Sequence, residues 1–411
     1  MSRYRLYPTP AQEQVLRGHC AHARFVWNLA VEQRSWWQPG RPAPGYVEQC
    51  RQLTEARAAN PWLATGSVIV QQQALRDFHA AYASWFASLR EWHERYASTR
   101  PERWPAMPSP PSWRKRGRSE GFRIVAVRPQ DIQRLNRRWS AVLVPKVGWI
   151  RLRLSRPVPA AKSYRVTRDR AGRWHVAFAV VPPAIPAPGN GQVVGLDRGV
   201  AVSAALSTGE LLTVSGLRPG ERRRLRLLQR RQARQRTGSR RRERTRLAVA
   251  RLTAKEADRR RDWTEKLSTD LARRFDVICV EGLDIRTMTR TARGTIERPG
   301  HNVRQKAWLN RSILASGWGR LVDRLEHKAP GRILKIPAAY TSQRCSSCGH
   351  VAAESRHSQT AFRCVACAWS GNADYNAARN IAAAGQVVAA RGGRGSPGPA
   401  NREPPTLDAV A

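Results

Sequence analysis

Three acidic residues in the C-terminal half of the chain have the types and settings that metal-dependent chemistry needs. Asp197 ends the run Val-Val-Gly-Leu-Asp, Glu281 ends the run Val-Ile-Cys-Val-Glu, and Asp374 precedes the segment Tyr-Asn-Ala-Ala. The first two runs are short, apolar and rich in β-branched residues, which is typical of buried strands. Carboxylates that meet at strand ends can hold two divalent cations, and two such cations can cleave a phosphodiester bond. We therefore expect a two-metal hydrolytic site.

Each acid also has a purely structural interpretation. Asp197 can cap a turn at a strand end, Glu281 can be a solvated end residue, and Asp374 can be the N-cap of the helix that follows it. Their order and spacing on a strongly basic chain favour the metal site. An Asp at the end of a first strand, with a β-hairpin after it, is also typical of the opening of an RNase H-like fold.

Four of the seven cysteines form two CxxC pairs with the spacing Cys345-x2-Cys348-x15-Cys364-x2-Cys367. This spacing is typical of a zinc ribbon in which four thiolates surround one Zn²⁺. Because four thiolates leave no open coordination position, we expect the zinc to be structural. A pair of redox dithiols is the alternative interpretation. The other three cysteines are scattered and are expected to be small core residues.

The composition indicates a polyanionic partner. The chain has 411 residues, with 73 Lys and Arg against 30 Asp and Glu, and its net charge is +43. An excess on this scale favours nucleic acid, because each phosphate that is neutralised releases counterions. An anionic membrane surface is the weaker alternative, since the charge is not confined to one amphipathic helix and no apolar run has the length of a membrane span. The N-terminus does not have the order of a signal peptide, so we expect a protein of the cytoplasm.

Two segments are candidates for nucleic-acid contact. Residues 219–262 read as one long basic helix with few acids for i,i+4 pairing, so a nucleic-acid groove explains the charge better than a solvated face. The run Trp113-Arg114-Lys115-Arg116 mixes an aromatic ring with cations and can stack on a base or contact a backbone.

Hydrophobic periodicity predicts the elements that must position these residues. The N-terminal half reads as a strand at 3–7, helices at 11–37 and 67–97 joined by a loop at 38–46, a Pro-rich stretch at 101–112, and short strands over 122–181 that suggest a small β-barrel. After a Pro-rich linker at 181–190 we expect strands at 193–196, 200–206, 211–214, 276–280 and 332–336, a helix at 312–328, the cysteine region 341–371, a helix at 374–384 and a disordered tail from 385.

Together these residues resemble the TnpB family, the transposon-encoded RNA-guided DNA endonucleases akin to the smallest type V CRISPR effectors. The resemblance covers about residues 3–384. It is carried in chain order by the segments 4–12, 23–28, 195–199 (Gly-Leu-Asp-Arg-Gly), 280–283 (Val-Glu-Gly-Leu), 299–304, 309–311, 341–349, 362–367 and 373–381 (Ala-Asp-Tyr-Asn-Ala-Ala-Arg-Asn-Ile). Ala368 departs from the family, in which a Gly is common at that position, and this affects the local turn alone.

The resemblance implies a multidomain α/β protein: an RNase H-like, RuvC-type nuclease domain with an inserted four-cysteine zinc ribbon, and a β-barrel wedge-like domain with an inserted α-helical recognition lobe. The expected boundaries are 1–9 and 116–185 for the barrel, 10–115 for the helical lobe, 186–340 and 372–384 for the nuclease domain, 341–371 for the ribbon and 385–411 for the tail. The family's nuclease acids fall on Asp197, Glu281 and Asp374, which speaks against its nuclease-dead relatives.

The resemblance also implies the activity. A guide RNA from the transposon end would pair with double-stranded target DNA, and the protein would read a short flanking motif. Gln71, Gln72 and Gln73 lie where the family contacts that flank, and a Gln can pair with an adenine edge; an ordinary polar helix face is the alternative. Two Mg²⁺ ions on the three acids would cut the DNA. The competing functions are a transposase or recombinase with the same acids and a non-cleaving RNA-guided repressor.

Overall fold

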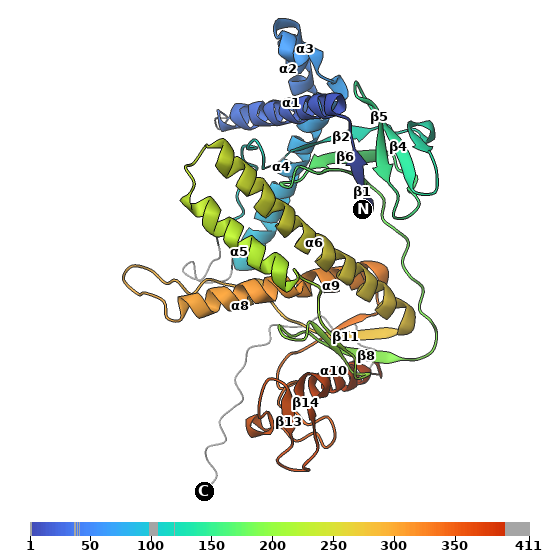
Figure 1. The fold of residues 1–411 in the computed structure, drawn as a ribbon, viewed down its shortest axis with the longest axis vertical. Helices are drawn as coiled ribbons and strands as arrows, with labels where there is room; N and C mark the ends of the chain where they lie inside the picture. Colours follow the sequence, from blue (N-terminus) through green and yellow to red (C-terminus); the bar gives the residue numbers. More distant parts are fainter. Residues whose placement is uncertain are drawn as a thin grey trace. The chain divides into compact units, whose positions relative to one another are not determined.

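The computed structural model describes residues 2–97 except 37, 39 and 41, then 106–118 and 120–390. The chain divides into two compact units (Figure 1). The first comprises Met1–Pro182 with Arg231–Arg251, and the second comprises Pro183–Arg230 with Leu252–Ala411. Residues 231–251 therefore cluster with the N-terminal unit, although the sequence analysis placed them in the nuclease domain.

The first unit contains one seven-stranded antiparallel sheet with the order β2-β6-β7-β1-β5-β4-β3. Its strands are β1 (Ser2–Tyr7), β2 (Gly121–Val125), β3 (Ile132–Arg134), β4 (Trp139–Val144), β5 (Gly148–Arg153), β6 (Ser163–Arg168) and β7 (Trp174–Phe178). As predicted, the N-terminal strand joins the later strands, and it pairs with both β5 and β7. The sheet ends at β2 and β3, so among the described residues no strand ladder closes it into the predicted barrel.

Four helices between residues 10 and 96 also belong to the N-terminal unit. They are α1 (Pro10–Ser35), α2 (Tyr46–Ala59), α3 (Pro61–Thr65) and α4 (Val68–Tyr96). The predicted start of α1 is confirmed, because Thr9 and Gln12 form a reciprocal capping box with Pro10 in the first turn. The sequence analysis missed α2 and α3, and the predicted loop ends at Gly45. Side chains of α1 and α4 share one core with the sheet, in which Leu16, Val26 and Phe78 are almost fully buried.

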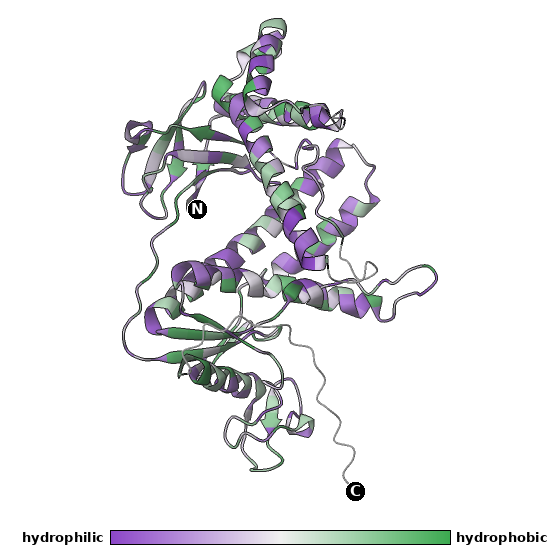
Figure 2. Ribbon diagram, turned by 180° about the vertical axis from the view of Figure 1, so that it is seen from behind, coloured by the Kyte–Doolittle hydropathy of each residue, from purple (hydrophilic) through white to green (hydrophobic). Residues whose placement is uncertain are grey.

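The second unit contains a five-stranded sheet with the order β10-β9-β8-β11-β12. Its strands are β8 (Val193–Asp197), β9 (Ala204–Leu206), β10 (Leu211–Leu212), β11 (Val277–Glu281) and β12 (Ile333–Ile336). Strands β8, β11 and β12 are parallel, and β9 and β10 form the predicted hairpin. Figure 2 shows the central strands of this sheet in the green of hydrophobic residues. Strand β9 begins at Ala204 rather than at residue 200.

Helix α10 (Ala373–Ala390) lies on one face of this sheet, and two glycines allow its close approach. A Cβ on Gly195 of β8 would clash with the backbone of Ala378, and a Cβ on Gly385 would clash with Cys279 of β11. The predicted helix end and disordered tail at Gly385 were therefore wrong for residues 385–390, because this glycine serves packing and does not end the helix. The rest of the predicted tail lies outside the described residues.

The opposite face of the sheet is covered by other helices. The core there joins Val194 and Val280 of the sheet to Leu271 of α6 (Arg240–Arg274) and Leu321 of α9 (Trp318–Lys328). The predicted helix 312–328 is two helices, α8 (Val303–Ser316) and α9, divided at Gly317, whose φ is 75°. The short helix α7 (Ile285–Met288) follows β11.

The predicted basic helix 219–262 is also two helices, α5 (Pro219–Arg234) and α6, and α6 continues to Arg274. The turn between them contains Gly238 with a φ of 82°. Arg242 donates to the carbonyls of Gln232 and Gln235 at 2.9 and 2.6 Å and closes the turn. The turn between α5 and α6 was not predicted, because Thr237-Gly238-Ser239 is the only local turn signal that interrupts the basic pattern.

The predicted cysteine region folds as a small ribbon between β12 and α10. It contains the strands β13 (Ala361–Arg363) and β14 (Ser370–Asn372), which pair antiparallel, and a short 3-10 turn at Ala353–Ser355. Over the described part of the chain, every helix is too short or too polar to cross a lipid bilayer.

Candidate active site and metal centre

Strand parity places two of the three predicted acids on the same face of the second sheet. Along β8, Val194 and Leu196 point into the core that α6 and α9 cover, so Gly195 and Asp197 point to the α10 face. Along β11, Ile278 and Val280 enter the same core, so Cys279 and Glu281 also point to the α10 face. Because β8 and β11 are adjacent and parallel, both acids stand at one edge of this face.

Helix α10 brings the third acid to that edge. Asp374 lies in its first turn. A Cβ on Gly199, just after β8, would lie 3.9 Å from Asp374 Oδ2. Asn372, and not Asp374, caps this helix, because its Oδ1 accepts from the N–H groups of Asp374 and Tyr375 at 2.9 and 3.0 Å. The capping interpretation of Asp374 was therefore wrong, and its carboxylate is left for the site.

The charges of Glu281 and Asp374 act on Asp197. Burial, followed by repulsion from Glu281 and then from Asp374, raises the pKa of Asp197 to about 7. Burial also raises the pKa of Asp374, against the attraction of Arg356. All three acids are half-buried, so they remain accessible from solvent. The arrangement concentrates negative charge that a divalent cation would neutralise.

Two neighbours position Glu281. The hydroxyl of Thr341 donates to its Oε1 at 2.6 Å, and the guanidinium of Arg198 donates to its backbone carbonyl. Arg198 is 5% exposed and lies next to Asp197 in the chain. Trp318 on α9 donates from Nε1 to the carbonyl of Gly199 at 3.1 Å and holds the loop that leaves β8. These contacts fix the ends of both strands at the site.

Arg356 is a candidate site residue that the sequence analysis missed. Its guanidinium lies 3.7 Å from Asp374 Oδ1, and its positive charge opposes the rise in the pKa of Asp197. It comes from the loop between the two CxxC pairs. Nothing in the local sequence distinguishes it from Arg363 in the same loop, and only the fold of the ribbon brings it to the acids.

The start of the ribbon is tied to α10 by two buried asparagines. Asn376 accepts from the N–H of Ser346 at 2.8 Å and donates to the carbonyl of Arg344 at 2.7 Å. Asn380 donates to the carbonyls of Thr341 and Arg344 at 2.9 and 2.7 Å. The helix that carries Asp374 therefore also holds the segment that carries Thr341.

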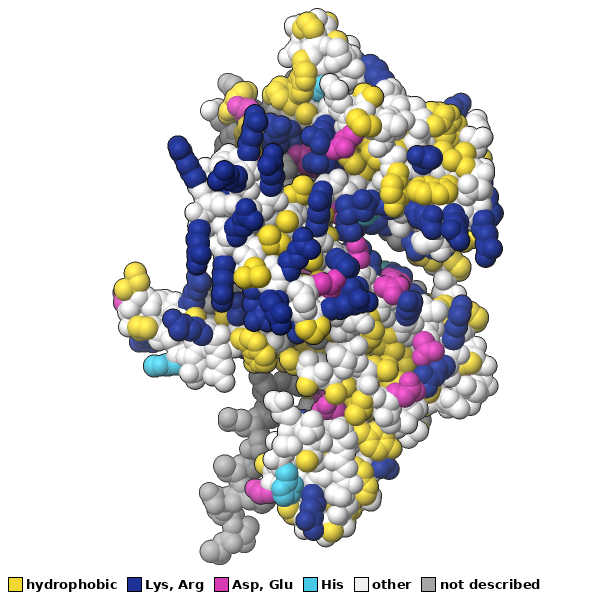
Figure 3. Space-filling view, viewed as in Figure 1, with side chains coloured by type: hydrophobic (Ala, Val, Ile, Leu, Met, Phe, Trp, Pro, Cys, Tyr) yellow, Lys and Arg dark blue, Asp and Glu magenta, His cyan; other side chains and the backbone are white. Residues whose placement is uncertain are grey.

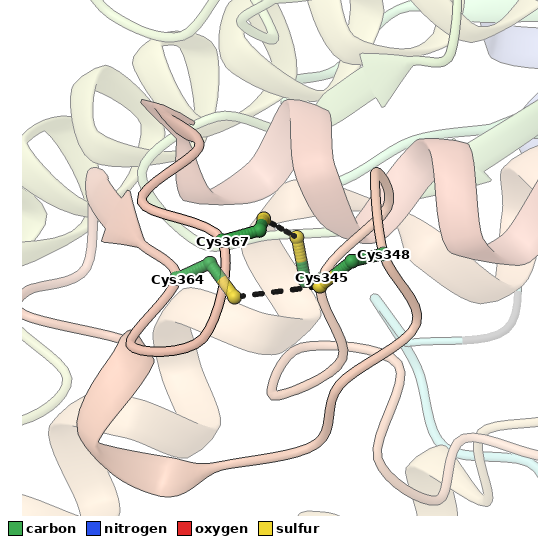
Figure 4. Close-up of side chains that lie close together, drawn as sticks. All are labelled: Cys345, Cys348, Cys364 and Cys367. Atoms are coloured by element: carbon green, nitrogen blue, oxygen red, sulfur yellow. Dashed lines mark hydrogen bonds between the residues drawn. The ribbon is translucent and has the colours of Figure 1, made fainter.

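The four predicted cysteines meet at the ribbon. Their side chains point toward one another, and Cys345–Cys367 and Cys348–Cys364 have sulfur distances of 3.7 and 3.6 Å (Figure 4). All four sulfur atoms lie within 4.8 Å of one another. The backbone N–H of Cys367 is the largest influence on the Cys364 thiol, whose pKa is lowered to about 6. Four thiols in this arrangement can hold one metal ion.

The three carboxylates are spaced differently from the four cysteines. Among the described residues, the cysteines are the single group whose ligand atoms all approach within 4.8 Å, so the carboxylates are spread more widely. At least one pair of their ligand atoms is therefore farther apart than 4.8 Å. Oxygen ligands and the excess negative charge around Asp197 favour hard divalent cations.

The predicted flank-reading glutamines differ in exposure. Gln71 is completely buried and donates to the carbonyl of Leu63 at 2.9 Å, and its Oε1 accepts from Arg57 at 2.5 Å. Gln73 is 5% exposed, and Gln72 is half-buried. These contacts give Gln71 a structural role in the α3–α4 corner, and Gln72 is the most accessible of the three.

The predicted basic run near residue 113 also divides into two kinds of side chain. Trp113, Lys115 and Arg116 are exposed. Arg114 lies over the ring of Trp27, with 3.6 Å between its guanidinium carbon and the ring centre, and burial lowers its pKa to about 10. Arg114 therefore packs against Trp27 and is less exposed than the other three side chains of the run.

The helices α5 and α6 carry a dense group of exposed basic side chains. Figure 3 shows dark-blue Lys and Arg side chains crowded over the region of these helices. One acid on these helices is already neutralised within the protein, because Glu221 forms ion pairs with Lys255 and Arg259, both at 2.5 Å. The predicted basic surface is thus present, on two helices instead of one.

Three family models match parts of the chain. Residues 2–41 match one described as "Helix-turn-helix domain", residues 153–292 match one described as "Probable transposase", and residues 318–381 match one described as "Cas12f1-like, TNB domain". The last match covers the ribbon and the start of α10.

Named relatives match nearly the whole chain. A protein of Escherichia coli (strain K12) named "Putative RNA-guided DNA endonuclease InsQ" is 33% identical over 397 residues, which cover 95% of this chain and 93% of that protein. A Streptomyces pristinaespiralis protein named "Putative RNA-guided DNA endonuclease" is 32% identical over 403 residues, or 95% of this chain and 90% of that protein.

A third relative matches a short stretch at higher identity. A Sulfoacidibacillus thermotolerans protein named "CRISPR-associated endodeoxyribonuclease Cas12f1" is 55% identical over 51 residues, which are 12% of each chain. The near-complete match to the Escherichia coli protein decides the family, and it agrees with the motifs around the three acids and the four cysteines. The chain therefore belongs to the TnpB-like family of RNA-guided DNA endonucleases.

Proposed function

We propose that this chain cuts DNA at sites selected by a guide RNA, and that Asp197, Glu281 and Asp374 form its catalytic centre. The observation that carries the proposal is the convergence of these acids at one sheet edge, where they repel one another enough to help raise the pKa of Asp197 to about 7. A structural role would not require three mutually repelling carboxylates. The relatives' names supply the substrate class and the RNA guide.

The acids would hold two Mg²⁺ ions, which when bound activate a water and stabilise the leaving oxygen of the phosphodiester. Thr341 and Arg198 keep Glu281 in place before the substrate arrives. Arg356 approaches from the ribbon and can donate to a non-bridging phosphate oxygen. In the free protein the guanidinium is paired with Asp374, so DNA binding would require it to turn from carboxylate to phosphate.

The cysteine site would hold one structural Zn²⁺. Its function would be to fold the ribbon, because the ribbon core contains little besides Phe362, Ala373 and two of the cysteines themselves. By folding the ribbon, the metal would also deliver Thr341 and Arg356 to the acids.

The nucleic acids would lie on the basic surfaces. A guide RNA from the transposon end would contact α5, α6 and the exposed part of the run 113–116. Double-stranded target DNA would be recognised by base pairing with that RNA and by a short flanking motif. Of the three predicted glutamines, Gln72 is the one whose exposure suits contact with the flank.

Purified protein with its co-purifying RNA tests this function. Plasmids that carry the matching target should be cut in the presence of Mg²⁺. Asp197→Ala, Glu281→Ala and Asp374→Ala should each abolish cleavage while target binding persists, because a two-metal site that lacks one ligand loses its geometry. Cleavage at wild-type rate by all three variants would refute the assignment of the acids. Strand joining without any bound RNA would instead indicate a transposase.

A further inference from the structure

The second unit carries a hairpin at residues 293–300, between α7 and α8, that the proposed catalytic centre does not use. Figure 1 shows this segment as a loop that projects past the start of α8. Gly294 and Pro299 form an antiparallel bridge, and the N–H of Gly300 donates to the carbonyl of Arg293 at 2.9 Å. The segment is therefore a paired, ordered projection.

The base of the hairpin is fixed to α8. The side chain of Asn310 donates to the carbonyls of Thr289 and Arg290 at 2.9 and 3.0 Å. The two arms of the hairpin also pack closely, because a Cβ on Gly300 would clash with the backbone of Ala292. These contacts fix the direction in which the tip points.

The tip of the hairpin is apolar. Ile296 is 100% exposed. Gly, Pro, Asn, Asp and Ser are the usual residues of tight turns, because they suit the backbone there, and isoleucine offers none of their advantages. Figure 3 shows hydrophobic atoms at the outer end of the same segment. An isoleucine held in water at this position gains free energy when a partner covers it.

The charge around the tip indicates the chemistry of that partner. Arg290, Arg293 and Arg298 are exposed on the hairpin and at its base, and Glu297 is the acid at the tip. Guanidinium groups bind phosphates, and apolar side chains can insert between the bases of a DNA step that is being opened. A carboxylate beside the isoleucine can accept from the exocyclic amine of an unpaired base. The combination fits DNA with accessible bases better than an apolar protein surface.

We propose that the hairpin 293–300 is a wedge that inserts Ile296 between bases of the target DNA at the border of its opened region. The inference rests on the proposed function for the presence of that DNA. The hairpin follows β11, which ends in Glu281, and it belongs to the same unit as the three acids. Ile296 would separate the stacked bases, and the arginines would hold the flanking phosphates, so that one strand stays free to enter the catalytic centre.

The test uses the full-length chain with its guide RNA and compares Ile296→Ser with Ile296→Leu. The serine variant removes the apolar tip, whereas the leucine variant keeps it. Val47→Ser is the matched control, because Val47 is an 80% exposed β-branched residue of α2 in the first unit.

Base unstacking is measured directly with permanganate, which oxidises unstacked thymines, on target DNA bound in Ca²⁺ so that it stays uncut. Ile296→Ser should lower the reactivity of thymines at the border of the opened region, and Ile296→Leu and Val47→Ser should not. Cleavage in Mg²⁺ is measured on a fully paired target and on a target whose two DNA strands are mismatched across the guided stretch. Ile296→Ser should cut the paired target several-fold more slowly and the mismatched target at the wild-type rate, because that DNA needs no wedge.

Several results would overturn the wedge. Wild-type permanganate reactivity and cleavage in Ile296→Ser would remove Ile296 from the DNA. Equal slowing on both targets would show that the hairpin supports catalysis in another way. A wild-type oligomer that Ile296→Ser converts to a monomer, with unchanged permanganate reactivity, would assign the tip to a second copy of the chain. In each of these cases the wild type still cuts its target and the proposed function stands. If the wild type with its RNA cuts neither target, the proposed function itself fails.

Discussion

At the scale of single residues, the hydroxyl of Thr341 should control cleavage through Glu281. The 2.6 Å hydrogen bond fixes one carboxylate oxygen, and Thr341 is only 7% exposed. Thr341→Val keeps the shape of the side chain and removes the donor, so cleavage should fall by about 10- to 100-fold, the usual effect of losing a hydrogen bond to a metal ligand. Thr341→Ser retains the hydroxyl and should recover most of the rate.

Cleavage rate and RNA affinity of the two Thr341 variants are measured side by side. RNA affinity should be the same for both, because Thr341 lies at the acids and not on the basic helices. Equal cleavage rates for the Val and Ser variants would show that Thr341 does not position Glu281.

His175 should make the stability of the first unit depend on pH. Burial, followed by repulsion from Arg3, lowers its pKa to about 4, although Asp169 opposes the shift. In the unfolded chain this group titrates near 6.5, so below that pH the unfolded state binds a proton that the folded state refuses. The first unit is therefore not destabilised by this group above pH 6.5. As the pH falls from 6.5 toward 4, its free energy of unfolding decreases by up to about 3 kcal/mol because of this group.

The urea midpoint of the first unit, compared at pH 7.5 and 5.0, checks this dependence. His175→Gln cannot gain the proton, so its midpoint should fall less than that of the wild type. His357→Gln, which changes an exposed histidine of the ribbon, should behave as the wild type does. An identical pH response in all three proteins would remove His175 as the source.

The sequence could predict the three acids and the four cysteines because their signals are local. Each acid follows a short apolar run or precedes a helix, and each cysteine pair has a fixed spacing. Arg356 and Thr341 carry no such signal. Their roles depend on the ribbon folding onto α10 through Asn376 and Asn380, which is a tertiary event.

At the scale of elements, the errors in the predicted helix boundaries also come from tertiary contacts that carry no local sequence signal. Gly238 and Gly317 divide helices where a left-handed backbone is needed, whereas Gly385 continues a helix because α10 must approach β11. A glycine in a helical pattern has either meaning, and only the neighbouring element decides between them. The strands of the second sheet were easier to predict, since a buried parallel strand is apolar along its whole length.

The crossing of α10 over β8 gives a prediction for Gly195. A Cβ at this position would clash with the backbone of Ala378 and would lie 2.5 Å from the backbone nitrogen of Ala382, so α10 would have to move away from the sheet. Gly195→Ala should destabilise the second unit by about 1–3 kcal/mol and should slow cleavage, because Asp374 moves with the helix.

Gly18→Ala is the matched control for Gly195→Ala. Gly18 lies in α1, and a Cβ at this position would have no heavy atom within 4 Å outside its own helix backbone and chain neighbours. Alanine there should leave cleavage unchanged and should stabilise the helix slightly. Urea unfolding and cleavage rates are measured for both variants. A Gly195→Ala protein with wild-type stability and rate would mean that α10 does not need this close approach.

At the scale of the whole molecule, RNA binding and catalysis should be separable, because they are assigned to different sets of residues. The exposed residues Trp113, Lys115 and Arg116 belong to the first unit, whereas the acids and the cysteine ribbon belong to the second. Helices α5 and α6 contribute residues to both units. A change confined to the ribbon should therefore affect cutting without affecting RNA binding.

Replacing Cys345 and Cys348 by Ser tests that separation. The double variant should lose its zinc, and the ribbon should unfold, because its few apolar side chains cannot fold it without metal. Thr341 and Arg356 would then no longer reach the acids, and cleavage should fall by about two orders of magnitude or more, as expected when the groups that orient a metal ligand are lost together. RNA affinity should stay at the wild-type value.

Zinc content, RNA affinity and cleavage rate are measured on this variant and on Cys50→Ser, which changes a cysteine outside the ribbon and should retain all three. Full cleavage activity in a zinc-free variant would show that the ribbon does not support the active site, and loss of RNA binding would show that the two functions are not separable.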